Sequence, residues 1–145
     1  MSTPKRIVRF LTTAQVTRFY ETNIMQASPS QLPMLESAVA SPQNHYRYGQ
    51  NDIFQLAGTL AERIILNHPY QDGNKRTALL AADMFLKING LQLQEKSVEK
   101  DDANEVLKQA QVAVADIQWS AENLAECYRA VARPLAEATA ETDQY

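Results

Sequence analysis

Nine consecutive residues, HPYQDGNKR at positions 68–76, bring several reactive side-chain types close together. His68 can accept a proton near neutral pH, so it is a candidate general base. Asp72 offers a hard carboxylate oxygen of the kind that Mg2+ binds together with substrate phosphates. Gly73 lets a ligand approach the backbone closely. Lys75 and Arg76 follow at once, so this segment holds a candidate base, a metal ligand and a site for an anion.

The two cations stand in an unusual place, because a helix is predicted to begin near Asn74. The N-terminus of a helix carries the positive end of its dipole and free N–H groups, so it attracts anions. Lys75 and Arg76 oppose that dipole at a cost of about 0.3–1 kcal/mol each, which makes sense if the site binds a polyphosphate. Taken singly, His68 could be a helix-end cation, Asp72 a turn residue and the two cations a solvated corner. The segment is not a Walker A loop, because the earlier glycine is missing.

Two long helices are predicted on either side of this segment. Asp52 caps the first, in which apolar residues recur every three or four positions until about Asn67, just ahead of a proline. The second runs from Asn74 to Asn89, with Gly90 as a left-handed cap. Its middle is apolar almost all round, which is typical of a helix at the centre of a bundle.

Four further helices are predicted, at about residues 12–25, 34–40, 101–114 and 121–133. Ser41 and Pro42 are expected to end the second of these. The polar stretch 43–51 has no helical period and is expected to be an exposed loop or hairpin. Because no segment is a clear strand, the sequence predicts an all-α fold with about six helices.

The chain has 145 residues, enough for one domain with a single core, which we place at residues 1–133. Small and acidic residues at 134–145 are predicted to form a flexible tail. The net charge of -3 gives no basic face for nucleic acid, and no apolar run reaches the roughly 20 residues of a membrane span. The single cysteine, Cys127, cannot form an internal disulfide, and no signal-peptide core is visible, so we expect a cytoplasmic protein.

Residues 68–79, HPYQDGNKRTAL, resemble the signature of the Fic/Doc superfamily. Residues 9–12 (RFLT) and 35–40 (LESAVA) are similar to its death-on-curing (Doc) branch, whose members are toxins of toxin–antitoxin pairs. The resemblance extends from about residue 8 to residue 133. It implies a single helical Fic-fold domain with a short flap loop or hairpin, which binds Mg2+ and ATP at the signature.

The resemblance also implies roles for individual residues. It makes His68 the general base that takes the proton from a target hydroxyl, and Asp72 the Mg2+ ligand. Phosphate binding falls to four consecutive residues, Gly73, Asn74, Lys75 and Arg76. A flap that aligns the target peptide by backbone pairing would lie at Tyr46, Arg47, Tyr48 and Gly49. An ordinary surface loop is an equally good interpretation of that last stretch.

Departures from the AMP-transferring branch favour a kinase. That branch has Gly where Lys75 stands and a second Arg where Leu79 stands. The resemblance therefore implies transfer of the ATP γ-phosphate to a Ser or Thr hydroxyl of a protein, with a translation factor such as elongation factor Tu as a possible target. AMP transfer on the same fold and a catalytically idle Fic-fold binding module are the alternatives. Tyr70 replaces the more usual Phe, so its ring is expected to anchor the loop while its hydroxyl needs a partner.

Many family members also carry an inhibitory helix with the pattern Ser/Thr-x-x-x-Glu-Gly/Asn. The nearest match here is the stretch from Thr17 to Glu21, but Thr22 follows in place of Gly or Asn. We therefore expect restraint to come from a separate antitoxin protein.

Overall fold

The computed structural model of the protein describes residues 7–94 and 102–135, whose regular secondary structure is helical apart from one short strand pair. The elements are α1 (Thr13–Asn23), α2 (Leu32–Arg47), α3 (Ile53–Asn67), α4 (Asn74–Lys87), β1 (Leu91–Gln92), α5 (Asp102–Ala115), α6 (Ala121–Val131) and β2 (Arg133–Pro134). The predicted all-α fold with about six helices is confirmed.

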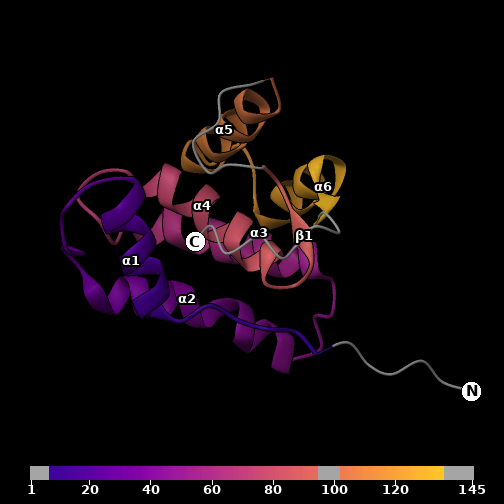
Figure 1. Cartoon of the computed structure of the whole chain (residues 1–145), viewed down its shortest axis with the longest axis horizontal. Coiled ribbons are helices and arrows are strands. Elements are labelled where there is room, and N and C mark those ends of the chain that lie inside the picture. Colours follow the sequence, from indigo (N-terminus) through magenta and orange to yellow (C-terminus); the bar gives the residue numbers. More distant parts are fainter. Residues whose placement is uncertain (1–6, 95–101, 136–145) are drawn as a thin grey trace, which may run out of the picture.

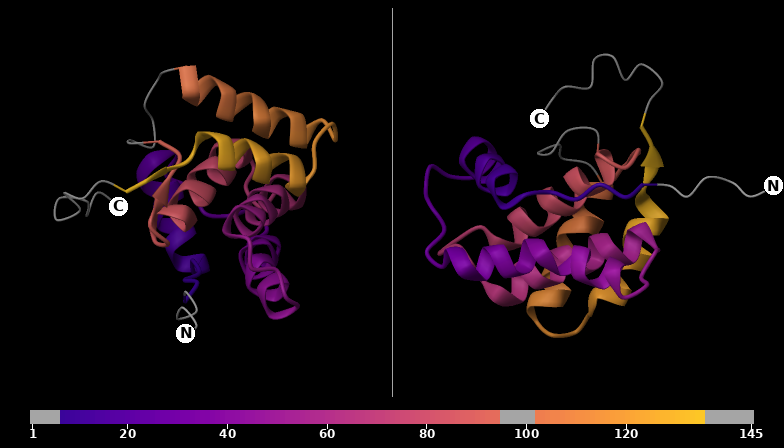
Figure 2. Two further views of the ribbon diagram at one scale, coloured as in Figure 1. Left: turned by 90° about the vertical axis from the view of Figure 1, so that its right-hand side faces the viewer. Right: turned by 90° about the horizontal axis from the view of Figure 1, so that it is seen from below.

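The helix α3 lies at the centre of the bundle and packs against α2, α4, α5 and α6. In Figure 1, α2 lies below α3 and α4, and α5 and α6 lie above them. The left view of Figure 2 keeps this order, and the right view, seen from below, shows α2 in front and α1 away from α6. The helix α1 packs against α4. The connection between α3 and α4, which holds the signature, therefore lies at one end of the central helix pair.

Local signals define α3 as the sequence predicts. The Asp52 carboxylate accepts a hydrogen bond of 2.9 Å from the Phe54 N–H and so caps the first turn. Gly58 faces α6, where a Cβ atom would come within 2.5 Å of the Ala121 carbonyl oxygen. This glycine lets the two helices approach closely, and the Glu62 carboxylate accepts a 2.9 Å bond from the Ala121 N–H at the start of α6.

The helix α4 is buried from Thr77 to Leu86, which confirms the expected central position. This includes Asp83, whose carboxylate accepts from the Leu93 N–H at 2.9 Å and pairs with Lys87 at 3.0 Å. Neighbouring elements cover α4 on every side, as a helix that is apolar all round requires.

The prediction for the end of α2 was wrong. Pro42 lies inside the helix, which continues to Arg47, so residues 43–47 are helical rather than a loop. An interior proline removes one backbone hydrogen bond and is unfavourable. The turn beyond it is supported by tertiary packing, because the Tyr46 ring lies edge-on to Phe10, with ring centroids 5.6 Å apart. Since that partner is 36 residues away in the sequence, no local pattern reveals it.

The start of the predicted C-terminal tail is also ordered. Arg133 and Pro134 pair antiparallel with Gln92 and Leu91, and the Leu135 N–H donates to the Gly90 carbonyl at 3.1 Å. Residues 136–145 of the predicted tail lie outside the described residues. No helix in the described part of the chain combines the length and apolar character that a membrane crossing requires.

Candidate active site

The signature begins where α3 ends, and two residues with left-handed backbone shape it. His68 terminates α3 with φ 50°, and Gly73 precedes α4 with φ 79°. Such a conformation is uncommon for a residue with a side chain. The turn at His68 exposes its ring at the end of α3, and the turn at Gly73 directs the chain into α4.

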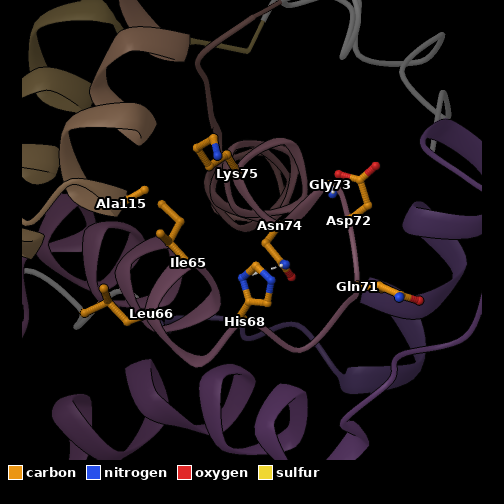
Figure 3. Close-up of a pocket in the computed structure, with 9 residues that line it drawn as sticks. All are labelled: Ile65, Leu66, His68, Gln71, Asp72, Gly73, Asn74, Lys75 and Ala115. Atoms are coloured by element: carbon orange, nitrogen blue, oxygen red, sulfur yellow. Dashed lines mark hydrogen bonds between the residues drawn. The ribbon is translucent and has the colours of Figure 1, made fainter.

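The Asn74 side chain holds the loop together from inside. Its carboxamide oxygen accepts from the Tyr70 N–H at 2.9 Å, and its nitrogen donates to the Tyr70 carbonyl at 2.7 Å. The same nitrogen lies 3.1 Å from His68 Nδ1. In Figure 3 the Asn74 amide points toward the His68 ring, and the dashed line marks this contact. The side-chain amide of Asn74 is thus occupied by hydrogen bonds within the loop. The part of Asn74 that we expect to bind phosphate is therefore its backbone N–H.

Two stacked tyrosines, Tyr70 and Tyr20, support the loop. Tyr70 is 1% exposed, so its ring anchors the loop in the core as expected, and it stacks on Tyr20 with centroids 3.6 Å apart. The Tyr20 hydroxyl donates to the Asp72 carbonyl at 2.9 Å, whereas the Tyr70 hydroxyl has no partner among the described residues. Burial, followed by the neighbouring Tyr20 and Glu21, raises the pKa of Tyr70 to about 12. Burial and the Asp72 charge also raise the pKa of Tyr20, and Arg76 opposes them.

Tyr20 is the residue of this site that the sequence reasoning missed as a functional candidate. It belongs to α1, a segment for which the sequence predicts only a helix. Its ring and the Ile24 side chain also close the space beside Gly73, where a Cβ would lie 2.9 Å from Ile24 Cγ2 and 3.5 Å from Tyr20 Cε2. The α1 helix therefore fixes the backbone on which Asp72 and the start of α4 depend.

The start of α4 is an uncapped helix N-terminus. Gly73 provides no capping side chain, and the first turn contains no acidic residue. The N–H groups of Asn74, Lys75 and Arg76 belong to the first helical turn, which has no carbonyl partner within the helix. The Gly73 N–H itself donates to the Asp72 carboxylate at 2.8 Å. Three backbone donors and two cationic residues, Lys75 and Arg76, thus belong to the first turn of α4, and a helix N-terminus of this kind attracts anions.

A cavity of about 390 Å³ brings most of the predicted residues together. Its polar side is formed by His68, Gln71, Asp72, Gly73, Asn74 and Lys75, and its apolar side by Ile65, Leu66 and Ala115. Figure 3 views α4 end-on, with Lys75 and Asp72 on opposite sides of the helix. Arg76 is exposed but does not line this cavity; it lies close enough to Tyr20 to affect the pKa of that phenol.

The predicted target flap is not beside this cavity. Tyr46 and Arg47 form the last turn of α2, so their backbones cannot pair as a strand, and Tyr48 and Gly49 follow before α3 begins. His68 lies after the other end of α3, whose 15 residues span about 22 Å. Tyr48 and Gly49 instead line a separate hollow with Asn44, His45 and Gln50. The placement of the flap at residues 46–49 is therefore corrected.

Asp72 is the one metal-ligand candidate that the signature provides. Within the described residues no three His, Cys, Asp or Glu side chains are grouped closely enough to hold a metal ion between them. The Asp72 carboxylate is exposed, and within the part of the chain that the structure describes only its Oδ1 atom is hydrogen-bonded, by the Gly73 N–H. Such a lone carboxylate suits Mg2+, which is commonly bound by one or two carboxylates, substrate phosphates and water.

Comparison with known proteins identifies the family of the chain. A family model described as the Fic/DOC family matches residues 4–86, which include the signature and most of α4. A relative named "Toxin Doc", from Mycolicibacterium smegmatis (strain ATCC 700084 / mc(2)155), is 36% identical over 95 residues. The match covers 63% of this chain and 72% of that relative. The chain belongs to the Fic/DOC family.

Proposed function

We propose that the protein is a Doc-like kinase that transfers the γ-phosphate of Mg2+-bound ATP to a Ser or Thr hydroxyl of a target protein. One observation carries this proposal: an exposed histidine ring, an exposed carboxylate and an uncapped helix N-terminus border the same cavity. A base, a site for a hard cation and a site for a polyphosphate are the groups that phosphoryl transfer requires, because its catalysis depends mostly on positioning and electrostatics.

In this proposal His68 accepts the proton of the target hydroxyl as its oxygen attacks the γ-phosphorus. The bond between that phosphorus and the bridging oxygen breaks, and ADP leaves with the bonding electrons. Mg2+ on the Asp72 carboxylate would neutralise charge on the phosphates. The first-turn N–H groups of α4 would bind phosphate oxygens, and Lys75 and Arg76 would supply positive charge from either side.

Leu79 supports γ-phosphate transfer over AMP transfer. Its side chain is 8% exposed and belongs to the apolar core. A cationic group that grips a distal phosphate, as the second Arg of the AMP-transferring branch does, is therefore absent at this position. Lys75 adds charge at the front of the site instead, so the polyphosphate is expected to bind with its γ-phosphorus toward His68.

The name of the relative extends the proposal to biological role. "Toxin Doc" describes that protein as a toxin, and we propose that this chain is a toxin as well. A toxin of this kind requires a separate antitoxin protein. A translation factor such as elongation factor Tu is the target that the family resemblance suggests.

The test supplies ATP labelled at either the α- or the γ-phosphorus, with Mg2+ and a bacterial lysate, and identifies the modified protein by mass spectrometry. We expect the γ-label on protein and a phosphate adduct on Ser or Thr. The matched inactive control is His68→Asn rather than His68→Ala, because asparagine tolerates the left-handed backbone at this position.

Each other outcome has a defined meaning. Retention of the α-label with an AMP-sized adduct rejects the kinase and supports AMP transfer. Nucleotide binding without transfer of either label supports an idle binding module. Transfer by His68→Asn at the wild-type rate rejects His68 as the base.

A further inference from the structure

The orientation of the Asn74 amide is determined by the backbone of Tyr70. The Tyr70 N–H can only donate, so the atom 2.9 Å from it must be the Asn74 oxygen. The Tyr70 carbonyl can only accept, so the atom 2.7 Å from it must be the Asn74 nitrogen. Two opposite requirements on one rigid amide exclude the flipped orientation.

The same amide then determines the state of the histidine. The Asn74 nitrogen lies 3.1 Å from His68 Nδ1 and has only hydrogens to offer. His68 Nδ1 must therefore accept this bond with its lone pair. A neutral imidazole carries one proton, so that proton must be on Nε2.

We propose that Asn74 is a positioning residue that holds His68 in the Nε2–H tautomer, with Nδ1 as the nitrogen that receives the target proton. Its consequence for catalysis rests on the proposed function of His68. In this resting geometry neither ring nitrogen is free to take a proton, because Nε2 already carries one and Nδ1 is occupied by Asn74.

Proton transfer then requires the Asn74–His68 bond to open. The target hydroxyl replaces the Asn74 nitrogen at Nδ1 and gives its proton to that atom as its oxygen attacks the phosphorus. The product ring carries protons on both nitrogens, and the released ADP carries the charge of the broken bond. Asn74 keeps both of its bonds to Tyr70 during this step, so the loop stays in place while the base is released.

The chain contains its own reference for testing this inference. It has two histidines, and the second, His45, is exposed on α2. We would label the histidines of the full-length protein with 15N and record imidazole correlations at about pH 8.5, roughly two units above the ordinary histidine pKa. His45→Gln assigns the signals. We expect His45 to show the mixture of tautomers of a solvated ring and His68 to show Nε2–H alone.

Substitutions at Asn74 test the cause. Asn74→Ala should relax the His68 tautomers to the mixture shown by His45. Asn74→Asp replaces the donor by an acceptor and should move the His68 proton to Nδ1. If either variant fails to fold, the comparison of His68 with His45 in the wild-type protein still tests whether His68 is held in the Nε2–H tautomer.

A His68 ring with the same mixture as His45, or with its proton on Nδ1, overturns the inference even where γ-phosphate transfer is intact. An unchanged His68 tautomer in a folded Asn74→Asp variant overturns it as well. If His68 is purely Nε2–H but no label reaches protein, the proposed function fails and the positioning by Asn74 stands.

Discussion

The same substitution, tyrosine to phenylalanine, should have opposite effects on the stability of the fold at the two stacked residues Tyr20 and Tyr70. Each phenylalanine substitution removes a single hydroxyl and keeps the ring. At Tyr20 that hydroxyl donates to the Asp72 carbonyl at 2.9 Å, whereas at Tyr70 it is buried with no partner among the described residues. The two variants therefore act as controls for each other.

The magnitudes follow from these environments. Tyr20→Phe loses one neutral hydrogen bond and should destabilise the fold by about 0.5–1.5 kcal/mol. Tyr70→Phe removes a buried unsatisfied hydroxyl, whose presence costs roughly 1–3 kcal/mol, so this variant should be more stable than the wild type. The free energies of unfolding of the two variants should then differ by at least about 1.5 kcal/mol. With a urea m-value of roughly 1.5–2 kcal/mol/M this is a midpoint difference of about 0.8–1 M.

Urea unfolding followed by circular dichroism measures both midpoints, and calorimetry with Mg2+ and ATP follows the site. Because Tyr20 holds the Asp72 carbonyl, Tyr20→Phe should also weaken Mg2+-dependent nucleotide binding, and Tyr70→Phe should not. Equal shifts of the two midpoints in the same direction would refute the assignment of these two hydroxyls. So would a Tyr20→Phe variant with wild-type stability and nucleotide binding.

Four further predictions follow from the same structure. Asp72→Asn should remove most of the Mg2+ dependence of ATP binding in calorimetry, while Asp116→Asn, at an exposed acid on the α5–α6 connection, should not change it. Gly58→Ala should destabilise the fold by about 1–3 kcal/mol in urea, since its Cβ would meet the Ala121 carbonyl at 2.5 Å, and a wild-type midpoint would contradict this contact. Gly73→Ala should cost more stability than Gly49→Ala, because both have positive φ but only Gly73 also meets a neighbour. At alkaline pH, Tyr70 is harder to ionise in the folded state (pKa about 12) than in the unfolded state (10.0), so stability should be complete below about pH 10 and fall toward pH 12, less steeply in Tyr70→Phe.

Where the determinants are local, the sequence was a sufficient guide to the fold. Asp52 and Thr12 cap α3 and α1 through side chains only two or three residues from the N–H groups that they bind. The apolar periodicity of α3 and the apolar residues all round α4 are likewise patterns within one segment of sequence. These features depend on neighbours along the chain, so they can be recognised before any tertiary structure is known.

Distant contacts account for the errors. The last turn of α2 persists beyond Pro42 with Tyr46 packed on Phe10, and the strand pair joins residues 91–92 to 133–134. A proline before a polar stretch is a good local signal for a helix end. Here the free energy of packing a half-buried aromatic ring outweighs it, and that term is visible only in the folded chain.

The site likewise has features that the sequence predicts and features that only the tertiary contacts determine. The residue types of the signature predict its chemistry because base, carboxylate and helix N-terminus lie within nine consecutive positions. The direction of the Asn74 amide and the support from Tyr20 could not be predicted, since they depend on which groups the fold places opposite them. The sequence therefore predicts which groups could react, and the tertiary contacts define how those groups are held.

The length of α3 explains why the predicted flap cannot serve this site. In the proposed reaction a target must reach His68, which follows the C-terminal end of α3, whereas residues 46–49 precede its N-terminal end. Besides α1, the signature is contacted by the segment just before α2, where the Gln31 N–H and the Ser30 hydroxyl donate to the Pro69 carbonyl at 3.0 and 3.2 Å. Because α2 and α3 are antiparallel, the start of α2, and not its end, lies beside the reactive loop. The length of α3 thus separates the polar stretch after α2 from this loop, however suitable its composition for aligning a target.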